Sequence, residues 1–176
     1  MKIVLVVALF GSLASSALSE DDNAPFTLAV VSSRSTAEER SIASAAKRAE
    51  TFYVVLTNTS GQAQPVWQTS CSWGFWTVSF DITLPDGKHV HTSRNHEQAF
   101  TKNTPATFLV LPGQQQIYPI QLDSTWDNLP QFPQAGTTRI TLKAIYQVGS
   151  TPEAVQENVW VGRLESPIYD FMLAHW

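Results

Sequence analysis

The stretch that decides the fold is Trp76-Thr-Val-Ser-Phe-Asp-Ile-Thr-Leu84. Apolar side chains take every second position, and threonine, serine and aspartate take the positions between them. A period of two is typical of a β-strand with one face in a core and the other in water. Pro85-Asp-Gly-Lys88 then predicts a tight turn, because proline fixes one φ angle and glycine accepts the geometry that the turn needs. We therefore expect His89–Ser93 to return as the second arm of a hairpin.

The same pattern of short apolar or alternating segments recurs on both sides of this hairpin. The further segments that we expect to be strands are Phe26–Val31, Thr51–Thr57, Phe108–Leu111, Gln116–Leu122, Arg139–Val148 and Val155–Leu164. Thr51–Thr57 is predicted to be a buried strand, since its apolar run is unbroken. Pro119 has no backbone donor, which places its strand at a sheet edge or a bulge. Seven to eight short strands with turn signals between them predict an all-β, antiparallel β-sandwich.

One stretch departs from the strand pattern. Ser35-Thr-Ala-Glu38 fits a capping box, and alanine, glutamate, lysine and arginine dominate the residues that follow. Its apolar face is thin and consists of Ile42 with alanines. We expect either a short helix near residues 36–49 or an insertion on the surface, and the sequence favours neither.

The N-terminal residues have the pattern of a secretory signal peptide. Lys2 precedes the apolar run Ile3–Phe10, and small residues lead to Ser19. We predict a signal peptide at residues 1–19 and a single domain at residues 20–176, in a secreted or periplasmic protein. The apolar run is shorter than the ~20 residues that cross a bilayer, so we expect no stable membrane span after cleavage.

Charge and cysteine content narrow the partners and the covalent chemistry. The formal net charge is −4, and no basic cluster extends beyond Lys47-Arg48, so we expect no nucleic-acid partner. Cys71 is the single cysteine, which excludes a disulfide within the chain. A buried thiol is the preferred interpretation, while an intermolecular disulfide and a reactive thiol remain alternatives.

Ala144-Ile-Tyr-Gln-Val148 resembles the sixth strand of immunoglobulin-like domains, which typically reads Ala-x-Tyr-x-Cys. Trp76 stands early in a candidate third strand, where such domains often carry a core tryptophan. The overall run of the chain, through Val159-Trp-Val-Gly162 to Ser166, is similar to poorly characterised bacterial exported immunoglobulin-like proteins. The resemblance implies an immunoglobulin-like sandwich in which the Tyr146 hydroxyl ties back to upstream backbone. Val148 stands where the second cysteine would be, so the resemblance does not imply its disulfide.

Aromatic residues gather in loops where a sandwich often places its binding surfaces. The candidate ligand- or partner-binding residues are Trp67, Trp73, Phe75 and Trp126. Exposed aromatic rings stack on carbohydrate or anchor a protein partner, so we expect either a protein or a carbohydrate partner. The alternative is that these side chains fill the core.

A second candidate site is the pair His89 and His91. Residues two apart on a strand share a face, and His96 follows within reach of a loop. Imidazole is a good ligand for transition metals, so His89, His91 and His96 form a candidate metal site. The alternative is a solvent-facing strand whose polar face carries histidines. No other cofactor is expected.

No catalytic signature stands out. The sequence has no Gly-x-Ser-x-Gly elbow and no glycine-rich phosphate loop. We therefore expect a non-enzymatic protein, an exported binding or assembly module. The alternatives are a metal-binding exported protein that uses the His-x-His strand, and an extracellular protease inhibitor that presents the loop Asn103-Thr-Pro105.

Overall fold

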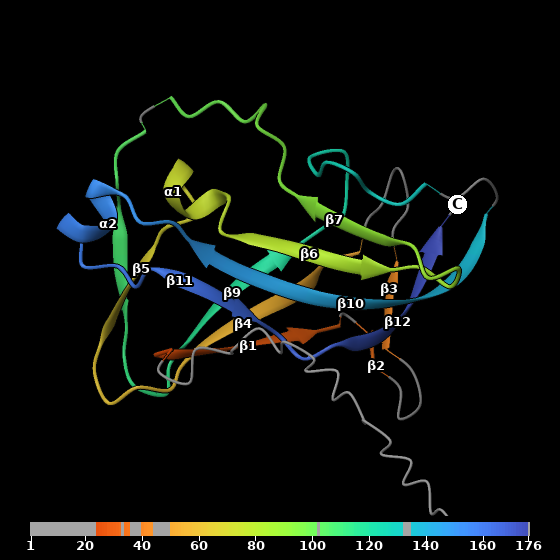
Figure 1. The fold of residues 1–176 in the computed structure, drawn as a ribbon, viewed down its shortest axis with the longest axis horizontal. Helices are drawn as coiled ribbons and strands as arrows, with labels where there is room; N and C mark the ends of the chain where they lie inside the picture. Colours follow the sequence, from red (N-terminus) through yellow and green to blue (C-terminus); the bar gives the residue numbers. More distant parts are fainter. Residues whose placement is uncertain are drawn as a thin grey trace, which may run out of the picture.

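The computed structural model describes residues 24–32, 34–35, 40–43, 50–101, 103–131 and 135–175. The predicted signal peptide at residues 1–19 lies outside these described residues. Figure 1 shows two main layers of strands that cross at an angle. No helix among the described residues is both long enough and apolar enough to cross a membrane.

The larger sheet is built around β10 (Gly136–Val148), which spans 13 residues. The strand order is β2 (Arg34–Ser35), β3 (Arg40–Ala43), β12 (Tyr169–His175), β10, β6 (Val78–Thr83) and β7 (His89–Ser93). The first half of β10 pairs with β12, and its second half pairs with β11 (Gly162–Glu165). Within the described residues the pairs of this sheet are antiparallel, except for the parallel pair of β3 and β12.

The second sheet has the order β1 (Phe26–Val31), β4 (Phe52–Asn58) and β9 (Gln115–Ile120). It faces the larger sheet, since the Phe52 and Phe80 ring centroids lie 5.5 Å apart. The hydrophobic core fills the space between the two sheets. Among the described strands β9 lies at the end of its sheet, which confirms the edge position predicted from Pro119.

A short ladder of β5 (Gln64–Trp67) and β8 (Thr107–Val110) continues the chain beyond β4 and β9. Asn58 stands at the junction with a fully buried side chain. Its Nδ2 atom donates to the carbonyl oxygens of Val110 and Gln62, each at 2.7 Å. Its backbone N–H donates to the Gln114 carbonyl at 3.0 Å. One side chain therefore holds the two ladders together.

Two short helices are described, α1 (Ser72–Phe75) and α2 (Pro152–Gln156). The second replaces the first part of the strand predicted at Val155–Leu164, so that prediction is wrong there. Thr151 caps the helix, because its hydroxyl oxygen accepts from the Ala154 N–H at 3.2 Å. Pro152 opens the first turn, and Asn158 follows the helix with a positive φ of 53°.

The all-β antiparallel sandwich is confirmed, with differences in detail. The described residues form twelve strands, more than the seven to eight expected, because several strands have only two to four residues. A short helix or a surface insertion was expected near residues 36–49. The structure describes Arg40–Ala43 of this range, and these residues form β3. Ser41 pairs with Met172 of β12, so pairing with a sheet edge outweighs the helix preference of the local sequence. The rest of that range lies outside the described residues.

Tyr146 and Trp76, two residues that carry the resemblance, lie in different surroundings. Tyr146 stacks on Trp160 with centroids 6.4 Å apart and lies 6.0 Å from Tyr118. Burial is the main cause that raises the pKa of both tyrosine hydroxyls, and the two hydroxyls also affect each other's pKa. Tyr146 thus packs against two aromatic rings in the core. Trp76 is half-buried at the end of α1, outside the main core.

Candidate functional site

Two of the four predicted binding aromatics are core residues. Trp67 is 1% exposed and Trp126 is 4% exposed. The Trp126 ring lies 5.3 Å from that of Phe80, and its Nε1–H donates to the Gln121 carbonyl at 2.7 Å. A buried indole with a satisfied N–H cannot stack on a ligand from solvent. Both side chains therefore fill the core, which was the alternative interpretation of these two residues.

Trp73 is half-buried and connects the two short helices. Its ring lies 6.1 Å from that of Trp67. The pKa of the Glu153 carboxyl is lowered by its own backbone N–H and the Thr151 hydroxyl, with a smaller contribution from the Trp73 side chain. Trp73 therefore links α1 to the start of α2.

Phe75 belongs to a separate aromatic cluster, which consists of Phe75, Trp76, His96 and Phe100. The Phe75, Trp76 and Phe100 rings meet edge to face at 5.6–5.8 Å, and His96 lies 5.2 Å from Trp76. The Arg94 guanidinium lies 5.3 Å from the centroid of Phe75. These contacts hold the loop after β7 against the end of α1. Trp76 and Phe100 were not among the candidate binding residues predicted from the sequence.

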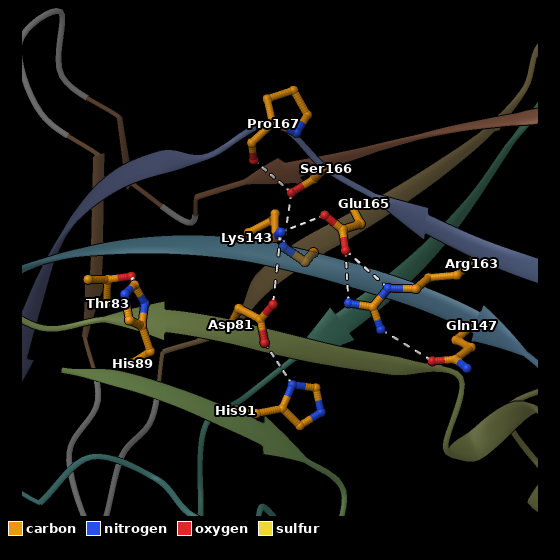
Figure 2. A network of polar contacts seen from close by, with 11 residues as sticks. Asp81, Thr83, His89, His91, Lys143, Gln147, Arg163, Glu165, Ser166 and Pro167 are labelled. Atoms are coloured by element: carbon orange, nitrogen blue, oxygen red, sulfur yellow. Dashed lines mark hydrogen bonds and ion pairs between the residues drawn. The ribbon is translucent and has the colours of Figure 1, made fainter. Parts of the chain in front are cut away.

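His89 and His91 project from the same face of β7, as predicted from their spacing. Each ring is anchored on the neighbouring strand β6 through its Nδ1 atom (Figure 2). His89 Nδ1 lies 2.9 Å from the Thr83 hydroxyl oxygen, and His91 Nδ1 lies 2.7 Å from Asp81 Oδ1. Both imidazoles are exposed to solvent.

His96 does not join this pair, because it packs on Trp76 in the aromatic cluster. Within the described residues no three side chains among histidine, cysteine, aspartate and glutamate are placed to hold a metal ion together. The three-histidine site predicted from sequence is therefore not assembled. A loop following a strand can turn in many directions, so the order of residues alone could not place His96.

A row of charged and polar side chains crosses the outer face of the larger sheet, and we call it the polar ladder. Its members are His91, Asp81, Lys143, Glu165, Arg163 and Gln147. Lys143 donates to Glu165, and its Nζ atom also lies 3.9 Å from Asp81 Oδ2. The bond from Lys143, followed by that from Arg163, lowers the pKa of the Glu165 carboxyl. Strand alternation places Ile145 on the same face as Lys143 and Gln147, with Glu165 as its partner on β11, and Ile145 is fully buried there.

A shallow hollow of about 420 Å³ opens between the histidine pair and the centre of this sheet. Its lining residues are Asp81, Thr83, His89, Val90, His91, Thr141, Lys143 and Ile168. Both histidines therefore border the same hollow as Asp81 and Lys143 of the polar ladder. Sequence spacing predicted the histidine pair, but Asp81 and Lys143 could be added only once the strand register was known.

The outer face of the three-stranded sheet has the opposite character. Three cross-strand rows cover it: Thr27–Thr57–Gln115, Ala29–Val55–Ile117 and Val31–Tyr53–Pro119. We call these residues the uncharged face, since none of them carries a charge. Six are apolar, and Val31 and Ile117 remain about half exposed, at 49% and 50%. An exposed apolar surface of this kind is typical of interaction sites.

Sequence analysis missed this face because it treated Thr51–Thr57 as buried throughout. The strand alternates instead, with Phe52, Val54 and Leu56 buried and Tyr53 exposed. The available signal was that both faces of Phe26–Val31 and Thr51–Thr57 are apolar. Such strands fit either a doubly covered sheet or a sheet whose outer face docks on something else.

Two further residues were singled out by the sequence. Cys71 is buried at 2% exposure, and its Sγ lies 3.2 Å from the Gln68 carbonyl oxygen, which confirms the preferred interpretation. Asn103 of the candidate inhibitor loop is tied to α1, because its side-chain amide exchanges two hydrogen bonds with Ser72 at 2.8 and 3.0 Å.

The chain was compared with protein-family models, curated proteins and solved structures, and no match was found.

Proposed function

We propose that this chain is a non-catalytic assembly module that associates through the uncharged face of β1, β4 and β9. The observation that carries this proposal is the contrast between the two outer faces of the sandwich. On the larger sheet Ile145 is buried on the face that carries the polar ladder, whereas the smaller sheet leaves Val31, Tyr53 and Ile117 in contact with water.

The partner that this face fits is a second copy of the chain. The protein is acidic, with a net charge of −4, so most pairings between copies bring like charges together. The uncharged face avoids that repulsion, because no carboxylate or cation lies within its three rows. A two-fold axis through the face would pack apolar rows on apolar rows. The threonine and glutamine row can donate and accept hydrogen bonds at the rim.

The dimensions of the uncharged face determine how strongly two copies are expected to associate. Strands about 4.8 Å apart and steps of about 6.7 Å along each strand give a patch on the order of 300 Å². A standard stable interface covers about 800 Å² on each partner. Association through this face alone is therefore weak and reversible, with a population of dimers that rises steeply with concentration.

Sedimentation velocity over a wide concentration range tests this proposal. The unmodified chain should show a reversible increase in sedimentation coefficient, and Ile117→Lys should abolish it because the lysine places a charge in the middle row of the face. The matched control is Val155→Lys, which introduces the same charge at a 74% exposed position on α2. A chain that stays monomeric at every concentration overturns the proposal, and so does association that Ile117→Lys leaves unchanged.

The proposal includes that the chain is exported and that its domain is related to immunoglobulin-like domains. The leader pattern at residues 1–19 supports export, and the burial of Ala144 and Tyr146 in the central strand supports the resemblance. Expression of the full chain in a bacterial host followed by N-terminal sequencing tests export. A mature chain that begins at Glu20 is expected, and an uncleaved chain retained in the cytoplasm contradicts it.

A further inference from the structure

We propose that His89 and His91 form a surface site for one Cu²⁺ ion, with water or a small ligand completing the coordination. The proposal is independent of assembly, since the histidine pair lies on β7 in the larger sheet and the uncharged face lies on the other sheet. It rests on three features of the structure: the orientation of each ring, the space in front of the pair, and the charge around it.

The first feature is the anchoring of His91. An ionised aspartate only accepts hydrogen bonds, so the 2.7 Å contact with Asp81 Oδ1 requires the proton to be on His91 Nδ1. In the neutral imidazole, Nε2 then carries the free lone pair that a metal needs. Metal-binding histidines typically have this second contact, a ring N–H that donates to a carboxylate. Asp81 is thus a positioning residue that selects the metal-binding tautomer.

His89 has a similar but less restrictive anchor. Its Nδ1 atom lies 2.9 Å from the Thr83 hydroxyl, which can donate or accept. The ring can therefore also present Nε2 to a ligand. Because Thr83 pairs with His89 and Asp81 pairs with His91 in the register of β6 and β7, both rings are held by consecutive outward residues of one strand.

The second feature is distance and access. Residues two apart on a strand are about 6.7 Å apart, and copper or zinc binds imidazole nitrogen at about 2 Å, so two such side chains can reach one ion. Both histidines border the hollow of about 420 Å³. That space can hold the remaining ligands, which are not supplied by a third histidine, cysteine or carboxylate in the described part of the chain.

The third feature is that the local charge does not repel a cation. Lys143 borders the hollow, but its ammonium is paired with Glu165 and lies 3.9 Å from Asp81. Two carboxylates therefore offset the charges of Lys143 and Arg163 within the polar ladder. We select Cu²⁺ because a site made of nitrogen and oxygen ligands binds it more tightly than the other divalent first-row metals.

A titration of the full-length protein with Cu²⁺ tests the site. Calorimetry measures the affinity and the number of bound ions, and electron paramagnetic resonance identifies the ligand atoms. We expect one bound ion at micromolar concentrations, with spectral coupling to two imidazole nitrogens. His89→Gln and His91→Gln should each remove one nitrogen and weaken binding strongly. The matched control is the double variant His96→Gln/His175→Gln, which changes the other two of the four histidines and should bind as the unmodified chain does.

The role of Asp81 has its own test. Asp81→Ala should weaken Cu²⁺ binding by about 10- to 100-fold, the usual effect of losing such a contact. Asp81→Asn keeps an acceptor for the His91 Nδ1–H and should bind Cu²⁺ more tightly than Asp81→Ala. Thermal unfolding of each metal-free variant shows whether the fold is intact. Failure of the folded, unmodified chain to bind Cu²⁺ at micromolar concentrations overturns the proposal, as does undiminished binding by the His89→Gln/His91→Gln double variant.

Discussion

The side-chain amide of Asn58 donates a 2.7 Å hydrogen bond to the carbonyl oxygen of Val110, and this contact joins two ladders of the sandwich. The same amide donates to Gln62. Asn58→Ala leaves the buried Val110 carbonyl without this donor, and we expect a loss of about 1–3 kcal/mol in the free energy of unfolding. Urea denaturation followed by tryptophan fluorescence measures it.

The neighbouring variant Thr59→Ala is the control, because Thr59 is exposed. Its free energy of unfolding should stay within about 0.5 kcal/mol of the unmodified chain. Equal effects of the two substitutions would show that the Asn58 amide does not hold the ladders together.

Trp126 should behave as a core residue and not as a ligand contact. Trp126→Ala removes a side chain that packs on Phe80, so we expect a destabilisation of about 3–5 kcal/mol. Thermal and urea unfolding measure this change. Val155→Ala, at an exposed apolar position, is the control and should have little effect. A Trp126→Ala chain of unchanged stability would contradict the buried position of this residue.

The fold was predictable where one periodicity dominated the sequence. Val78, Phe80 and Ile82 alternate with polar residues, and they are buried as the pattern predicts. Gly87 has a φ of +82° in the predicted turn. The segment Val155–Leu164 was less predictable. Thr151 caps a helix that begins at Pro152, and the apolar residues of the segment do not indicate this helix.

The candidate sites depended on contacts between distant segments. His89 and His91 could be predicted as a pair because the period of a strand places them on one face. His96 could not be excluded from sequence, since its packing on Trp76 depends on the path of a loop. Trp67 and Trp126 were conspicuous as residue types, yet the core of a chain without an internal disulfide needs such large side chains.

The ion pairs of the polar ladder should make stability depend on pH in the acidic range. Lys143 and Arg163 hold the pKa of Glu165 below its ordinary value, so the ionised carboxylate is favoured in the folded state. The resulting stabilisation is complete above the unfolded-state pKa, about 4.3, and is lost as the pH falls through the lower folded-state pKa. Because the pair is partly exposed, its contribution is within about 1 kcal/mol.

Urea unfolding at neutral and acidic pH checks this expectation. The unmodified chain should lose more stability on acidification than Glu165→Gln, which has no carboxylate to protonate. The control Glu97→Gln removes an exposed carboxylate outside the ladder and should follow the unmodified chain. Identical pH profiles for Glu165→Gln and the unmodified chain would show that the ion pairs of Glu165 do not contribute to the pH dependence of stability.

Cys71 should be unreactive while the protein is folded. Its side chain is buried and contacts the Gln68 carbonyl, so a thiol reagent in solution has no direct access to the sulfur. We expect slow labelling by a chromogenic disulfide reagent in buffer and rapid, complete labelling in denaturant. Rapid labelling of the native chain, or a dimer on a non-reducing gel, would contradict the buried position.

The most direct test of assembly through the uncharged face is hydroxyl-radical footprinting of the unmodified chain at low and high protein concentration. Tyr53 and Ile117 are exposed in the single chain, at 38% and 50%, and should be oxidised less when the protein is concentrated. Val155 on α2 should be oxidised equally in both samples. Equal oxidation of Tyr53 and Ile117 at both concentrations would contradict the proposed assembly surface.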